Sequence, residues 1–267
     1  MKEYYQRVSD KVLLEHLESK GAVLIEGAKW CGKTTSAKHI AKSVIEMDRP
    51  DMTEQYQQMA RINPSNLLEG KVPHLIDEWQ IATNIWNAVR YEVDQRGEFG
   101  QFILTGSSVP AALDESMHTG TGRIVRMQMR PMSLFESKDS TGQVSLMDLF
   151  NKKDISAVDN HSIDEIAFLI CRGGWPAALN HSKKVALKQA FDYYDAVVND
   201  DISRVDRVKR DSERTKRILK SYARNVATQA SLETIRSDII SNDVETFDKE
   251  ALYGYLNALK RIFVIED

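Results

Sequence analysis

The feature that most constrains the fold is a glycine-rich segment that follows the short apolar run 22–25. It contains a glycine, four further residues, a second glycine, a lysine and a hydroxyl residue, over residues 27–34. In such a segment, successive backbone N–H groups point inward at phosphate oxygens, and glycine removes the Cβ atoms that would block them. Residues 34–43 have helical apolar spacing. The segment therefore predicts a strand, a phosphate loop and a helix, in that order.

The last residues of the loop have distinct expected roles. Lys33 is expected to reach the β- and γ-phosphates of ATP, and Thr34 is expected to ligate magnesium, while the helix N-terminus adds its positive dipole end. Lys29 and Trp30 are expected to cover the edge of the nucleotide, with loop packing as the alternative, and Cys31 is expected to be only a small loop residue. The predicted nucleotide-binding residues are Gly27, Ala28, Lys29, Trp30, Cys31, Gly32, Lys33, Thr34 and Thr35.

An acidic pair directly follows a later apolar run. Asp77 and Glu78 come immediately after Leu75 and Ile76. In P-loop ATPases an aspartate at the end of a strand holds magnesium, and we expect the next carboxylate to polarise the attacking water. Asp77 is therefore predicted to be a second magnesium ligand, and Glu78 a catalytic residue. Because acidic pairs also begin helices as N-caps and first-turn charges, helix capping is the alternative.

Short apolar runs alternate with segments of helical periodicity along the first half of the chain. Strands are expected at residues 22–25, 43–47, 72–76 and 101–104, and a fifth within 123–129. This alternation is typical of a parallel sheet covered by helices on both faces. We therefore expect an α/β fold of the P-loop NTPase type.

Hydroxyl residues follow the fourth run. Thr105, Ser107 and Ser108 stand where ligands collect in open parallel sheets, and a hydroxyl group there can orient the attacking water. Thr105 and Ser107 are therefore predicted to be catalytic. An ordinary polar turn is the alternative.

Arg123 is the best sequence candidate for a cation that stabilises charge on the transferring phosphate. It follows glycines at positions 120 and 122, which make the segment flexible enough to carry a cation towards the nucleotide. We expect Arg123 to act on the nucleotide of a neighbouring subunit, or on its own once the chain closes over it. Arg126 and Arg130 are alternatives, and arginines that flank a strand are usually solvated.

Composition indicates a globular protein. Of the 267 residues, 42% are hydrophobic and 28% are charged, which suggests neither disorder nor a fibre. No apolar stretch approaches the roughly 20 residues of a membrane-spanning helix, and the N-terminus lacks a secretory signal. The 2 cysteines and 6 histidines show neither a disulfide framework nor zinc spacing. We expect a cytoplasmic protein with no membrane contact and no structural metal.

The second half of the chain differs in pattern from the first. Residues 136–161 are polar, and helical periodicity follows, with a final apolar strand expected over residues 261–265. We predict an ATPase core over residues 1–137 and a linker over 138–160. The remainder is expected to be mainly helical.

Nucleic-acid binding is not the default expectation. The formal net charge is −3, so the chain lacks the basic excess that would favour it globally. Residues 204–224 are locally basic, but acidic residues are interleaved with the basic ones. A solvated helix face is the main interpretation, and contact with a phosphate backbone is the alternative.

On these residues the sequence resembles a large archaeal and bacterial family of AAA+-like ATPases, in which the ATPase module is followed by a domain of unknown function. Lys29 and Trp30 stand where the family usually has arginine and glutamine. The pieces that look alike are residues 27–35, 75–78, 104–108, 122–123, 131–136 and 173–176.

The resemblance has several structural implications. It implies that the phosphate-loop strand lies next to the strand that ends at Thr105. It implies a helical lid over residues 161–210 and a winged-helix-like module over 211–267. Family members usually continue into a domain that resembles restriction-type nucleases, so the resemblance also implies that the winged helix is incomplete here.

We therefore expect an AAA+-like ATPase that binds ATP, ADP and Mg²⁺ and whose nucleotide state repositions the lid and the winged helix. A homo-oligomer and DNA contact through the winged helix stay open. The alternative is an ATP-regulated DNA-binding regulator with slow or no hydrolysis. A small-molecule kinase is disfavoured, because Glu78 stands beside Asp77 and Thr105 ends a separate strand.

Overall fold

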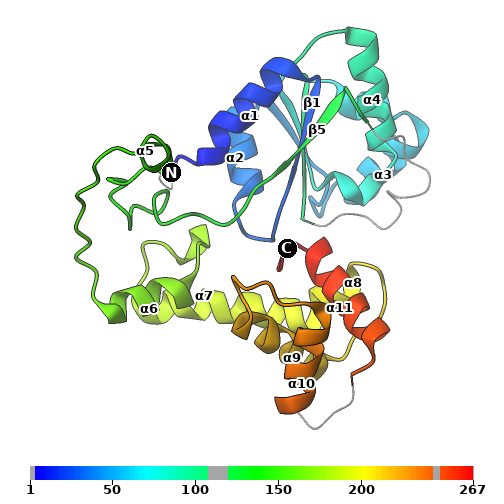
Figure 1. The fold of residues 1–267 in the computed structure, drawn as a ribbon. Coiled ribbons are helices and arrows are strands. Elements are labelled where there is room, and N and C mark those ends of the chain that lie inside the picture. Colours follow the sequence, from blue (N-terminus) through cyan, green and yellow to red (C-terminus); the bar gives the residue numbers. More distant parts are fainter. Residues whose placement is uncertain (1–3, 108–119, 243–246, 267) are drawn as a thin grey trace.

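A computed structural model describes residues 4–107, 120–242 and 247–266. These residues form an α/β unit followed by a helical region (Figure 1). The strands of the α/β unit are β1 (Ala22–Glu26), β2 (Ser43–Glu46), β3 (His74–Asp77), β4 (Phe102–Gly106) and β5 (Ile124–Gln128). Its helices are α1 (Val8–Ser19), α2 (Lys33–Ile40), α3 (Thr53–Ile62) and α4 (Ile85–Arg96), with 3₁₀ turns at Pro64–Leu68 and Trp79–Ala82.

The five strands form one parallel sheet in the order β2-β3-β4-β1-β5. In the register of the sheet, Ala22 of β1 lies opposite Phe102 of β4 and Ile124 of β5. The predicted α/β fold and its five strands are confirmed, as is the implied pairing of β1 with β4. Because the strands are parallel, the residues that follow β1, β3 and β4 meet at one edge of the sheet.

Both faces of the sheet are covered. Successive side chains of a strand point to opposite faces, and the residues of β1 alternate between two cores. Ala22 and Leu24 pack with α3 and α4, whereas Val23 and Ile25 pack with α1 and α2. The central strands are therefore buried on both sides, which explains why β1 and β4 consist mainly of apolar residues.

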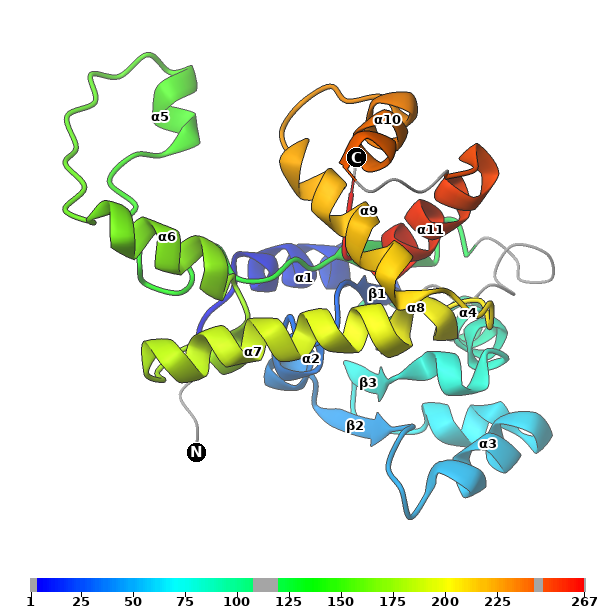
Figure 2. The same cartoon turned by 90° about the horizontal axis from the view of Figure 1, so that it is seen from below.

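The helical region lies beyond the edge of the sheet where β1 ends, and α7 (Lys183–Ala196) runs along this edge (Figures 1 and 2). One apolar core joins Val197, Ile218, Ile239 and Leu259, and it spans the predicted boundary at residue 210.

The helices are α5 (Leu146–Phe150), α6 (Ile163–Arg172), α7 (Lys183–Ala196), α8 (Ile202–Arg204), α9 (Ser212–Arg224), α10 (Leu232–Asn242) and α11 (Lys249–Arg261). A 3₁₀ turn occupies Pro176–Ala178, and a π-helical turn occupies Val197–Asp201. No described helix combines the length and hydropathy that a membrane crossing needs.

The prediction of a final strand over residues 261–265 is wrong. Helix α11 continues to Arg261, and the chain then turns, with Phe263 in a left-handed conformation at φ 58°. Ile262 and Ile265 are only 7% and 8% exposed because they pack into the helical core. Within the described part of the helical region, α9, α10 and α11 follow one another without any strand of a wing.

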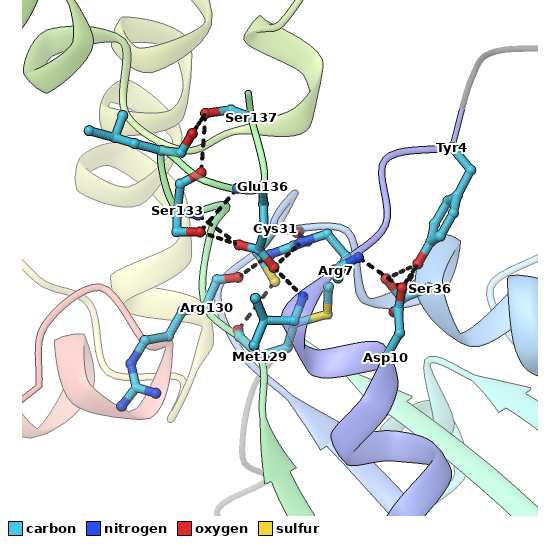
Figure 3. Close-up of polar contacts among 12 residues, drawn as sticks. Tyr4, Arg7, Asp10, Cys31, Ser36, Met129, Arg130, Ser133, Glu136 and Ser137 are labelled. Carbon is cyan, nitrogen blue, oxygen red and sulfur yellow. Dashed lines mark hydrogen bonds and ion pairs between the residues drawn. The ribbon is translucent and has the colours of Figure 1, made fainter. Parts of the chain in front are cut away.

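Arg7, directly before α1, ties the N-terminal segment to the phosphate loop and to the segment after β5 (Figure 3). Its guanidinium donates to the carbonyl oxygens of Cys31 and Arg130, each at 2.8 Å, and pairs with Glu136 at 3.0 Å. The side chains of Arg7 and Glu136 are only 4% and 7% exposed. Burial opposes the charge of Glu136, but backbone N–H donors and Arg7 hold its pKa below the ordinary value.

We predict that Arg7→Met lowers the free energy of unfolding by about 3–5 kcal/mol, because a buried carboxylate loses its cation. Urea-induced unfolding measures the change. The control is Arg123→Met, which removes a pair with Asp94 whose side chains are 45% and 39% exposed. This exposed pair should contribute at most about 1 kcal/mol. Equal losses in the two variants would contradict the supporting role of Arg7.

Candidate functional site

The phosphate loop leaves β1 after Glu26 and enters α2 at Lys33. Gly27 has a φ of 153°, and a Cβ atom at this position would lie 2.1 Å from the carbonyl oxygen of Met129. Gly32 is the N-cap of α2 and has a left-handed φ of 105°. Both positions therefore require glycine, which accounts for the two glycines of the sequence pattern.

Lys33 is seated inside this loop. Its Nζ atom donates to the carbonyl oxygens of Gly27 and Ala28, each at 2.8 Å, and the residue is 6% exposed. Burial lowers its pKa from the ordinary value of a lysine. The loop thus holds a desolvated ammonium group, and such a group interacts strongly with an anion because little water screens it.

Asp77, the last residue of β3, connects three segments. Its Oδ1 atom accepts a hydrogen bond from Thr34 at 2.8 Å and another from Thr105 at the end of β4. Asp77 is 5% exposed and Thr105 is fully buried. The structure therefore brings together the two predicted magnesium ligands and one of the two predicted hydroxyl residues.

The oxygens of Thr34 and Asp77 fit a magnesium ion. Mg²⁺ takes hard oxygen ligands at about 2.1 Å in an octahedron, which places neighbouring ligand oxygens about 2.9 Å apart. The two side-chain oxygens are 2.8 Å apart. Magnesium in nucleotide sites is usually held by one or two protein oxygens, with phosphates and water as the other ligands, and this pair meets that requirement.

Glu78 follows β3 in a left-handed conformation, with φ 53° and ψ 44°. Such backbone conformations in non-glycine residues are costly and cluster at functional sites. The Oε2 atom of Glu78 accepts hydrogen bonds from Gln80 and, at 3.4 Å, from the hydroxyl of Ser107. Burial raises the pKa of Glu78 above the ordinary value, so its carboxylate is a stronger base than that of an exposed glutamate. Ser108 lies outside the described residues.

Arg123 lies at the other edge of the sheet. Its carbonyl oxygen accepts a hydrogen bond from the N–H of Ala22, the first residue of β1, whereas the phosphate loop follows the last. β1 has 5 residues, so its two ends are roughly 13 Å apart. The side chain of Arg123 pairs with Asp94 of α4 at 2.7 Å. In this arrangement Arg123 does not face its own loop, and its action between subunits or after closure of the chain stays a prediction.

The alternative arginines are both held by carboxylates of this chain. Arg126 Nη1 lies 3.5 Å from Oε1 of Glu26, the residue before the loop. Arg130 pairs with Glu266 at 2.8 Å. A catalytic role for either one stays a prediction.

Residues of the helical region complete the surroundings of the loop. A cavity of about 190 Å³ is bounded by Lys29 and Ser107 on the sheet side and by the helical region on the other. Asp201, the last residue of the π-helical turn, pairs with Lys29 at 2.5 Å. The residues of the helical region that line this cavity are Tyr193, Val197, Asp201, Arg204, Val205 and Ile262.

Sequence reasoning did not find Asp201 or Arg204 as site residues. Asp201 is 172 positions from its partner Lys29, so no local spacing connects the two. A π-helical turn, which frequently marks a functional site, is a signal of the three-dimensional structure and not of the sequence.

Comparisons with known proteins agree with this geometry. Residues 19–138 match a family described as an AAA domain, and residues 163–267 match a family described as a domain of unknown function. These findings support a P-loop AAA-like ATPase. The chain matches no curated protein.

Among solved structures, the chain is similar to the Walker-type ATPase PABY2304 of Pyrococcus abyssi. The identity is 15% and the TM-score 0.53, over 97% of this chain and 90% of that chain. This likeness shows a shared fold. PCH-2 of C. elegans matches at 14% identity and a TM-score of 0.31, over 94% and 64% of the two chains. The AAA domain of FIGL-1 in complex with ADP matches at 14% and 0.36, over 98% and 84%. TM-scores of 0.31 and 0.36 do not establish a shared fold.

We predict that Arg123→Ala leaves ATP turnover by a single chain unchanged, because Arg123 lies at the edge of the sheet opposite the loop. Phosphate release at high dilution measures this. A loss of turnover in the dilute protein would contradict the placement. A loss seen only in assembled protein, and partly restored by mixing with Lys33→Ala, would instead show action between subunits.

Proposed function

We propose that this chain binds ATP with magnesium and hydrolyses it at the edge of the sheet where β1, β3 and β4 end. The observation that carries the proposal is the 2.8 Å contact between Thr34 and Asp77. It joins two oxygen ligands of the kind that magnesium prefers, from residues 43 positions apart. The phosphate loop and the buried Lys33 lie next to this pair.

Each residue then has a defined role. Backbone N–H groups of the loop bind the phosphates, and Lys33 turns from the loop carbonyls to the β- and γ-phosphates. Thr34 and Asp77 would hold magnesium, which supplies positive charge against the phosphate oxygens. Glu78 orients a water molecule and accepts its proton as the oxygen attacks the terminal phosphorus. The bond to the leaving oxygen breaks, and ADP and inorganic phosphate result.

Two hydroxyl residues at the end of β4 support these groups. Thr105 donates to Asp77 and fixes the carboxylate orientation from β4. Ser107 donates to Glu78 at 3.4 Å and can also contact the attacking water. We therefore infer that Thr105 is a positioning residue and that Ser107 acts beside Glu78.

We also propose that the nucleotide state repositions the helical region, with residues 161–210 as a lid and 211–267 as a winged-helix-like module. The cavity between Lys29 and the π-helical turn supports this, because the helical region there borders the loop. A cytoplasmic location and assembly into a homo-oligomer belong to the same proposal.

An ATP-regulated DNA-binding regulator is the alternative function. Several basic residues of the 204–224 segment are paired within the chain, including Arg210 with Asp206 at 2.6 Å and Arg224 with Asp238 at 2.5 Å. Such pairs weaken attraction to a phosphate backbone. DNA affinity that falls steeply with salt concentration would favour the alternative.

We predict that Lys33→Ala raises the dissociation constant for Mg-ATP by at least about 100-fold, because two charge-assisted contacts of about 1.5 kcal/mol each are lost. Calorimetric titration measures the constant. The matched control is Lys38→Ala on the same helix, where the side chain is 40% exposed and pairs with Glu46. If both variants bind ATP like the wild type, the phosphate-loop assignment fails.

We predict that Glu78→Gln keeps Mg-ATP bound but lowers turnover by about 100-fold or more, because an amide does not accept the proton of water. Calorimetry and phosphate release measure the two quantities. Turnover near that of the wild type would show that Glu78 is not catalytic and only occupies the N-cap position of the turn after β3.

The pH dependence of the wild type provides a second measurement for Glu78. Burial and the neighbouring Asp77 raise its pKa, whereas the Gln80 hydrogen bond and the charge of Lys33 lower it, and the net shift is upward. Since the carboxylate is the active form and kcat/KM reports the free enzyme, kcat/KM should fall on acidification at a higher pH than an ordinary glutamate would cause. Loss only in the ordinary range would indicate another titrating group.

A further inference from the structure

The third residue of the phosphate loop is held by the helical region. Lys29 Nζ donates to Oδ1 of Asp201 at 2.5 Å. The side chain of Lys29 is 41% exposed, whereas that of Asp201 is 8% exposed. The carboxylate is therefore buried, and Lys29 is the cation that compensates it from the solvent side.

The next residue of the loop also touches the helical region. Trp30 has a left-handed φ of 62°, and its ring lies 5.7 Å from that of Tyr193 of α7. Tyr193 in turn packs against Trp175 with 4.1 Å between ring centroids. Two consecutive loop residues thus contact the helical region. A change in loop conformation would therefore alter the contacts of α7 and of the π-helical turn.

Lys29 lies on the side of the loop where a terminal phosphate would be placed. It shares the cavity with Ser107, and Ser107 donates to Glu78, the residue proposed to orient the attacking water. Burial and, to a smaller extent, the charge of Lys29 lower the pKa of Lys33, so the two ammonium groups are close enough to interact.

We propose that Lys29 distinguishes ATP from ADP by exchanging its partner Asp201 for the terminal phosphate, and that this exchange releases the π-helical turn from the loop. The inference rests on the proposed nucleotide binding. A lysine ammonium is a compact charge on a flexible stem. Its single positive charge can balance one anion, so it does not compensate Asp201 and a phosphate at the same time. The terminal phosphate carries more charge than Asp201 and wins the exchange.

When Lys29 leaves Asp201, the cost is greater than the loss of an exposed ion pair. Asp201 is then a buried carboxylate without its cation, which is unfavourable until the turn moves and the carboxylate meets water or another donor. ADP lacks the γ-phosphate, so it leaves Lys29 paired with Asp201. By thermodynamic reciprocity, the contact that ATP must break weakens ATP binding and leaves ADP binding unaffected.

The test compares Asp201→Asn with Asp200→Asn, its exposed neighbour in the same π-helical turn. Both are made in the Glu78→Gln background, so that ATP persists during calorimetric titration. We expect Asp201→Asn to tighten Mg-ATP binding by about 5- to 10-fold, within the usual range of coupling between sites, and to leave Mg-ADP binding unchanged. Asp200→Asn should change neither constant. Lys29→Met should remove the effect, so that adding Asp201→Asn to it changes nothing further.

Hydrogen exchange of the wild-type protein gives a measurement that does not depend on a variant folding. The slowly hydrolysed analogue ATPγS with magnesium should speed exchange in residues 197–204 relative to ADP. Equal hydrogen-exchange rates with both nucleotides would contradict the proposal, as would an equal effect of Asp201→Asn on ATP and ADP binding. Either result would show that the pair of Lys29 with Asp201 only stabilises the fold. Failure of the wild type to bind either nucleotide would overturn the proposed function itself.

Discussion

Oδ1 of Asp77 accepts hydrogen bonds from the hydroxyl groups of both Thr34 and Thr105. A single oxygen thereby joins the end of β3, the start of α2 and the end of β4. Asp77 is 5% exposed, and a buried carboxylate without donors is strongly unfavourable, so the edge of the sheet depends on these two bonds. A hydroxyl that donates its proton keeps its lone pairs. Thr34 can therefore ligate a metal while it still orients Asp77, and the contact that holds the fold together also prepares the metal site.

Two long-range contacts hold the phosphate loop, and they differ in kind. Arg7 donates to the carbonyl oxygen of Cys31, and its ion pair with Glu136 is buried at both ends. The pair of Lys29 with Asp201 is buried only at the carboxylate. A guanidinium that is buried among several acceptors cannot change partner without losing them all. A half-exposed ammonium on a flexible stem can. The first contact is thus a fixed support of the loop, and the second is exchangeable.

The sheet was predictable from the sequence because each strand is a short apolar run with turn residues at its ends. The loop, Asp77 and Glu78 were predictable because their spacing is local. Arg123 lies at the end of β5 opposite to the loop, and a flexible segment before a strand does not reveal this position in the sequence. Residues 261–265 were expected to form a strand on the basis of their apolar side chains, but Ile262 and Ile265 satisfy the same hydrophobicity by packing into the helical core. The contact of Lys29 with Asp201 depends on how two distant segments pack, and no pattern along the chain encodes it.

The two lysines of the loop respond differently to a bound phosphate. Lys33 donates to the carbonyl oxygens of Gly27 and Ala28, which are neutral and belong to the loop itself. When Lys33 turns to a phosphate, those carbonyls lose a hydrogen bond, and the effect stays within the loop. Lys29 compensates a charged group in another part of the fold, and its departure leaves that charge buried. Only the second event creates an unfavourable state within the helical region. A movement of the helical region that depends on nucleotide is therefore expected to begin at Lys29 and not at Lys33.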